Sequence, residues 1–140
     1  MNIFLLSVTD NLQTELRNSI AEELSKRGGT VAYISSEPQD GDLQYYKSTI
    51  EDYSQFGSDI KVDYFDLSGN FSDEALLKLL DYGAIYLSGG NTYVFMDSAK
   101  KRNIYPILKK HLENGGLLIG ASAGSIMMTP TIDLAGIGGD

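Results

Sequence analysis

A serine at the centre of five small residues is the feature of the sequence that is most able to do chemistry. Residues 120–124 read Gly-Ala-Ser-Ala-Gly and overlap the end of an apolar run at 117–121. This is the Gly-x-Ser-x-Gly pattern of a nucleophile elbow, in which a strand turns sharply into a helix and exposes the serine hydroxyl. The neighbours must be small, because larger side chains would make the strand and the helix collide. We therefore predict that Ser122 is a nucleophile.

The same turn would supply part of an oxyanion hole. The amide of Ala123 would lie at the N-terminus of the helix that follows, directed at the position where a tetrahedral oxyanion forms. A plain strand-to-helix connection that contains a small polar residue is the alternative interpretation of these five residues.

A second glycine-rich stretch favours the chemical interpretation. Residues 89–93 read Gly-Gly-Asn-Thr-Tyr and follow another apolar run at 84–87. This stretch, followed about thirty residues later by Gly-Ala-Ser-Ala-Gly-Ser, resembles the peptidase E family of serine peptidases, the α-aspartyl dipeptidases with cyanophycinases as relatives. The order of elements over residues 1–128 resembles that family as well. The resemblance implies a class I glutamine amidotransferase-like fold with serine at the elbow position.

The resemblance also implies roles for the glycine pair and its neighbours. A second oxyanion amide would come from Gly90 in the first place and from Gly89 in the second. Gly89 and Asn91 would contribute to substrate binding, and Asn91 with Thr92 would fix the loop and cap the next helix. Neither a metal nor an organic cofactor is implied.

The general base is missing from the expected place. In the resembled family the catalytic histidine follows the nucleophile, beyond the acid, whereas the single histidine of this chain, His111, precedes it. His111 shares a helical stripe with apolar residues, so we predict that it packs at the edge of the core rather than acting as a base. No lysine follows Ser122, which removes a Ser-Lys alternative.

The orienting acid of a catalytic triad is also uncertain in this sequence. Asp133 and Asp140 are the only acidic residues after Ser122, and Asp140, in a glycine-rich loop, is the better placed candidate for the orienting acid. Solvated loop carboxylates are the alternative interpretation of both residues.

The last ten residues follow no regular pattern. Residues 131–140 complete neither a helix nor a strand pattern. We therefore predict a chain that stops inside its fold and is catalytically incomplete as written.

The rest of the sequence predicts a doubly wound, mostly parallel α/β sheet with helices on both faces, forming a single domain over 1–140 that is incomplete at the C-terminus. Short apolar runs that read as strands alternate with amphipathic segments that read as helices. The strands are expected at 3–6, 31–34, 60–65, 84–87 and 117–121, and the helices at 12–24, 43–56, 72–80, 92–101 and 104–113.

Several local expectations can be tested in the structure. Asp10 or Asn11 would cap the first helix and Gly28-Gly29 would stop it. Ser72 would cap the third helix, and the alternation over 60–65 is typical of a strand near a sheet edge. An aromatic stripe on the second helix is interpreted as core packing; it consists of Tyr45, Tyr46, Ile50, Tyr53 and Phe56.

Composition narrows the choice of partners. The net charge of −8, with no basic stretch, argues against nucleic-acid and anionic-membrane partners. There is no cysteine, no apolar run long enough to span a bilayer and no recognisable signal peptide, which fits a cytoplasmic protein. A small peptide substrate is expected, together with possible self-association through the surface that a missing C-terminal part would leave exposed.

Three functions are compatible with these features. The first is a serine peptidase that acts on short peptides with N-terminal aspartate through an acyl-enzyme on Ser122, a preference that rests on the resemblance. The second is an α/β-hydrolase-type esterase, although the sequence has no His-Gly-Gly-Gly-type oxyanion loop. The third is a non-catalytic remnant that binds small anions at helix N-termini, or partners. No nucleotide-binding motif is present.

Overall fold

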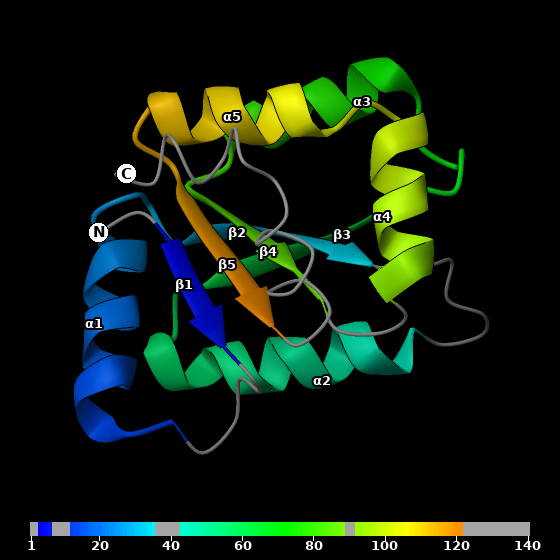
Figure 1. Ribbon diagram of the computed structural model, residues 1–140. Coiled ribbons are helices and arrows are strands. Elements are labelled where there is room, and N and C mark those ends of the chain that lie inside the picture. The colour runs from blue at the N-terminus through cyan, green and yellow to red at the C-terminus, as the bar shows by residue number, and fades with distance from the viewer. Residues whose placement is uncertain (1–2, 7–11, 36–42, 89–91, 122–140) are drawn as a thin grey trace.

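Five parallel strands form the centre of the molecule. The computed structural model describes residues 3–6, 12–35, 43–88 and 92–121. All four strand pairs are parallel, in the order β1-β5-β4-β2-β3 (Figure 1). The strands are β1 (Ile3–Leu6), β2 (Thr30–Ser35), β3 (Lys61–Asp66), β4 (Ala84–Leu87) and β5 (Leu117–Ala121). Parallel neighbours require crossover connections, and helices supply them here.

Helices cover both faces of this sheet. One face carries α3, α4 and α5, and the other carries α1 and α2 (Figure 1). The helices are α1 (Thr14–Ser25), α2 (Gln44–Tyr53), α3 (Asp73–Leu77), α4 (Thr92–Lys101) and α5 (Tyr105–Glu113), with 3-10 turns η1 (Ser54–Phe56) and η2 (Lys78–Asp81). The predicted fold class is confirmed. The assignment of residues 1–140 to a single, C-terminally incomplete domain stays a prediction.

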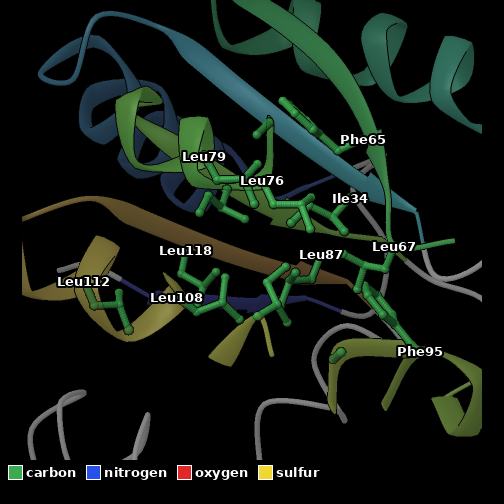
Figure 2. Packing of buried hydrophobic residues seen from close by; sticks show 14 residues of the cluster. Ile34, Phe65, Leu67, Leu76, Leu79, Leu87, Phe95, Leu108, Leu112 and Leu118 are labelled. Carbon is green, nitrogen blue, oxygen red and sulfur yellow. The ribbon is translucent and has the colours of Figure 1, made fainter. Parts of the chain in front are cut away.

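The sheet separates two apolar cores because successive strand residues point to opposite faces. Ile34 and Leu87 point toward the core under α3, α4 and α5, whereas Tyr33 and Tyr86 point toward the core under α1 and α2. Figure 2 shows the first core, with Phe95 of α4 beside Leu67 and Leu87. Near-complete burial of the central strands on both faces explains why their sequences are continuous apolar runs.

Aromatic rings fill much of the second core. Tyr33 lies in register between Tyr64 and Tyr86, with ring centroids 6.0 and 5.6 Å away. Tyr53 of α2 packs edge-on against Tyr86 at 5.4 Å. The predicted aromatic stripe is therefore core for Tyr53, Phe56 and the half-buried Tyr46, as expected. The expectation is wrong for Tyr45 and Ile50, which are 72% and 41% exposed because they lie on the outer side of α2.

The local signals at the helix ends are mostly confirmed. Gly28 and Gly29 follow α1 with φ angles of 84° and 71°, the left-handed conformation that glycine adopts without strain. The Ser72 hydroxyl accepts a hydrogen bond from the Ala75 amide at 3.1 Å, which caps α3. The start of α1 is later than expected: Thr14 is its first residue and Gln13 precedes it without a side-chain cap. Asp10 and Asn11, the expected caps, lie outside the described residues.

Candidate active site

The two strands that precede the glycine-rich motifs, β4 and β5, are neighbours in the sheet. β4 and β5 pair in parallel, with Leu87 opposite Gly120, so Ser88 and Ala121 follow at the same level. Adjacent strands lie about 4.8 Å apart. The chain continues from Ser88 into the Gly-Gly-Asn-Thr stretch and from Ala121 directly into Ser122. The sheet therefore brings Ser88 and Ala121, the described residues that precede Gly89 and Ser122, side by side at its carboxyl edge, where open α/β sheets bind their ligands.

The predicted site residues themselves are not among the described ones. This applies to Gly89, Gly90, Asn91, Ser122, Ala123 and Asp140, and also to Asp133. The structure places the elements on either side of them, and their predicted roles stay predictions.

The described residues on either side of the glycine pair are held by packing and hydrogen bonding. The amide of Ser88 donates a hydrogen bond to the carbonyl oxygen of Ile34 at 3.1 Å, which fixes the chain against β2 just beyond the end of β4. On the other side, α4 begins at Thr92 and is held by Phe95 and Ala99, both fully buried.

The carboxyl edge also carries buried polar residues that the sequence analysis did not single out. Ser35 and Asp66 lie in register at the ends of β2 and β3, and both are buried. Asp66 accepts hydrogen bonds from the Tyr64 hydroxyl and the Ser68 amide, each at 3.0 Å, and from the Ser68 hydroxyl. The alternation of Tyr64, Asp66 and Ser68 in the sequence was a possible signal. Because β3 lies three strand spacings, or about 14 Å, from β5, Asp66 organises its own turn rather than the nucleophile.

His111 lies at the amino end of β5, and Ala121 is at the other end of that strand. It is 1% exposed, and its Nε2 lies 2.8 Å from the carbonyl oxygen of Leu117, the first residue of that strand. Four residue steps separate Leu117 from Ala121, and at about 3.3 Å per step this amounts to roughly 13 Å. The prediction that His111 belongs to the core is confirmed. The buried imidazole therefore lies at the end of β5 remote from Ala121, the residue that precedes Ser122 in the sequence.

Burial is the main influence on the protonation of His111. It lowers the pKa of the imidazole below its ordinary value, and the positive charge of Arg27 acts in the same direction. The hydrogen bond with the Leu117 carbonyl opposes this shift. The folded protein therefore holds His111 neutral under conditions in which an exposed histidine is already protonated.

Acidification should consequently weaken the fold before the carboxylates titrate. As pH falls below about 6.5, the ordinary histidine pKa, the unfolded chain binds a proton that the folded chain does not. The free energy of unfolding should fall by up to about 1.4 kcal/mol per pH unit until the folded-state pKa is reached. Urea unfolding between pH 7.5 and 5 measures this. A His111→Gln variant, which cannot titrate, should lose the slope, and an unchanged slope would show that other groups cause it.

The described residues, 3–6, 12–35, 43–88 and 92–121, were compared with two structural patterns, a cluster of metal ligands and a membrane-spanning helix. Nowhere in these ranges do three His, Cys, Asp or Glu side chains gather as metal ligands. None of the helices described there is long and apolar enough to cross a membrane.

Comparison with known proteins decides the family. The model of peptidase family S51 matches residues 3–139, nearly the whole chain. The chain belongs to peptidase family S51. The resemblance drawn from the two glycine-rich motifs is thereby confirmed, and family S51 proteins are peptidases, that is, hydrolases.

Two curated relatives carry the same kind of description. An uncharacterized peptidase of Pasteurella multocida (strain Pm70) is 33% identical over 72 residues, covering 51% of this S51 chain and 35% of the relative. An uncharacterized peptidase of Listeria monocytogenes (serovar 1/2a, strain EGD-e) is 25% identical over 114 residues, covering 79% of this chain and 53% of the relative. The chain thus spans between a third and about half of the length of these relatives.

Solved structures confirm the S51 fold. A candidate peptidase E from Listeria monocytogenes EGD-e superimposes with a TM-score of 0.70 at 24% identity, covering 88% of this chain and 59% of that one. A peptidase from an acI-B1 Actinobacterium superimposes with a TM-score of 0.58 at 18% identity, covering 87% and 54%. At these identities the likeness concerns the fold alone.

Proposed function

We propose that this S51 chain carries the nucleophile half of a serine peptidase that cleaves short peptides after an N-terminal aspartate. Family membership supports the peptidase activity. The observation that carries the serine mechanism is the parallel pairing of β4 and β5, with Leu87 opposite Gly120. It lets the Gly-Gly-Asn-Thr stretch and Ser122 start from adjacent strand ends. An esterase of the α/β-hydrolase type has no comparable support once the family is known.

The proposed reaction uses residues from both motifs. The Ser122 hydroxyl attacks the carbonyl carbon of the scissile peptide bond and gives up its proton to a base. Amides of Ala123 and Gly90 stabilise the oxyanion, and the C–N bond then breaks as the leaving amine gains a proton. Water hydrolyses the resulting acyl-enzyme. Gly89 and Asn91 contact the substrate, Asp140 is the candidate orienting acid, and no cofactor takes part.

The base is the part that this chain does not provide. Its only histidine, His111, is buried at the far end of β5. A serine hydroxyl without a base is a poor nucleophile near neutral pH, and losing the base costs about 10⁶-fold in turnover in a well-studied serine protease. We therefore propose that the 140-residue chain by itself is nearly inactive, although it binds peptides. The same observation keeps a purely binding role as the second candidate.

The substrate class can be tested by supplying the missing base from solution. In buffer containing imidazole, the chain should hydrolyse the dipeptide Asp-Leu more than 10-fold faster than Asn-Leu, because the proposed site recognises the aspartyl carboxylate. Product formation is followed by liquid chromatography. Equal rates for both dipeptides would contradict the aspartate preference. Binding of Asp-Leu without any hydrolysis would favour the binding role.

We also propose that the peptidase activity takes place in the cytoplasm, because the sequence contains no cysteine.

A further inference from the structure

The proposed aspartate preference requires a cation in the site, and burial narrows the choice among the basic residues. Every lysine of the chain is exposed, so water screens its charge. The three arginines, Arg17, Arg27 and Arg102, are half-buried. A charge interacts more strongly where water is partly excluded, and a guanidinium can donate two parallel hydrogen bonds to one carboxylate. An arginine is therefore the better candidate.

Two of the three arginines are already used by the fold. Arg27 Nε donates a hydrogen bond to the carbonyl oxygen of Gly115 at 2.8 Å, and its guanidinium pairs with the Glu23 carboxylate at 3.4 Å. The Arg102 guanidinium pairs with the Asp73 carboxylate at 3.1 Å. Its Nη1 atom is buried, so a substrate cannot reach it. Each of these two cations faces a carboxylate of the protein itself.

Arg17 differs from both of them. Within the ranges that the structure describes, its side chain forms no ion pair and no hydrogen bond. Acids on the same helix cannot neutralise it, because no acidic residue stands three or four positions away. Those positions hold Gln13, Thr14, Ile20 and Ala21. Arg17 is therefore the half-buried cation whose charge the described part of the fold leaves unpaired.

The course of α1 places Arg17 toward the carboxyl edge of the sheet. α1 begins near the ends of β1 and β5 and runs back along them (Figure 1). Its far end is tied to the segment before β5 by the bond between Arg27 and Gly115. Ten residues, or about 15 Å of helix, separate Arg27 from Arg17, which is similar to the roughly 13 Å length of β5. Arg17 consequently lies near the level at which β5 reaches Ala121.

The side chain of Arg17 also starts from the inner face of α1. Ile20 and Leu24, three and seven residues later, are buried in the core under α1 and α2, and residues at this spacing share one helix face. Helical side chains lean toward the N-terminus of their helix. For α1 this is the direction of the carboxyl edge, where Ala121 leads into Ser122.

We propose that Arg17 binds the side-chain carboxylate of the substrate's N-terminal aspartate, an assignment that rests on the peptidase function proposed above. The guanidinium donates two hydrogen bonds to the two carboxylate oxygens. An asparagine side chain offers one oxygen and no charge, so it binds less tightly. The net charge of −8 makes a local cation necessary, because the chain as a whole repels an acidic peptide.

Binding of Asp-Leu and Asn-Leu, measured by titration calorimetry without imidazole, tests this assignment. The wild type should bind Asp-Leu at least about 10-fold more tightly than Asn-Leu, as expected for hydrogen bonds between charged groups. Arg17→Gln should bind both dipeptides equally, and Arg17→Lys should keep only part of the preference, since lysine retains the charge without the planar fork. Lys109→Gln is the matched control: it removes the same charge from an exposed position on α5, so it should keep the wild-type ratio.

The possible failures can be told apart. An undiminished preference for Asp-Leu in Arg17→Gln would overturn the assignment and leave the peptidase function standing. A urea midpoint of Arg17→Gln well below that of the wild type, without peptide, would show that Arg17 pairs within the fold and would also overturn it. A wild type that neither binds Asp-Leu nor hydrolyses it with imidazole would contradict the proposed function itself, and the role of Arg17 would fall with it.

Discussion

Replacing Gly116 with alanine is expected to lower the free energy of unfolding by about 3 kcal/mol, at the upper end of the usual cost of overpacking a core. A Cβ atom on Gly116 would lie closer than 3.0 Å to three atoms of the His111 ring. That ring cannot move aside cheaply, because it is buried and hydrogen-bonded to the carbonyl oxygen of Leu117. The Gly116 amide also donates to the carbonyl oxygen of His111 at 2.8 Å, which holds the two residues together.

The neighbouring glycine provides a control with a different physical cause. A Cβ on Gly115 would meet nothing within 4 Å, but its φ of 86° is unfavourable for alanine, so Gly115→Ala should cost only about 1 kcal/mol. If the ring causes the Gly116 effect, Gly116→Ala should cost less than about 1 kcal/mol in a His111→Ala background. Urea unfolding of the four members of this cycle measures the coupling. Additive costs would show that His111 is not the obstacle.

Most of the fold could be predicted from the sequence because local signals and packing agree. The bounds of β4, α4 and β5 match the expected 84–87, 92–101 and 117–121. Each of these elements is an apolar run or stripe next to glycine, and burial against the sheet requires the same pattern. Ser72 acted as expected for a similar reason, since a cap depends on residues three positions away.

The predictions that were wrong or missing concern side chains whose burial depends on packing between elements. The aromatic stripe of α2 covers more of the helix surface than the sheet can bury, so Tyr45 is left on the outside. The burial of Asp66 could not be predicted from the sequence. Its carboxylate is satisfied by the Tyr64 hydroxyl and the Ser68 amide, which come close to it only in the folded strand and turn. The sequence also could not show that His111 lies at the amino end of β5. That position depends on α5 packing antiparallel to the strand that it precedes.

The sequence predicted which residues form the candidate site, but only part of their spatial arrangement. The two motifs identified the family, and the structure adds that the strands leading into them are neighbours in register. The positions of Gly90 and Ser122 relative to each other lie outside the described residues. The clearest contribution of the structure is the position of His111, which is buried beside Leu117, roughly 13 Å from the other end of β5.

Substitution of Ser122 should have the largest effect on activity. If Ser122 is the nucleophile and this chain lacks only a base, imidazole in solution should supply that base. Hydrolysis of Asp-Leu by the wild type should then increase with imidazole concentration. Ser122→Ala removes the attacking oxygen, so its rate should be at least about 100-fold lower at every concentration, a small part of what a nucleophile contributes in serine proteases.

The rate of Asp-Leu hydrolysis by wild type and Ser122→Ala, measured side by side from zero to high imidazole, is the most direct test of this account. We predict almost no turnover by either protein without imidazole, and an imidazole-dependent rate in the wild type alone. His111→Gln should behave as the wild type does, because His111 lies at the far end of β5. Equal rates in wild type and Ser122→Ala at all imidazole concentrations would contradict the claim that Ser122 is the nucleophile.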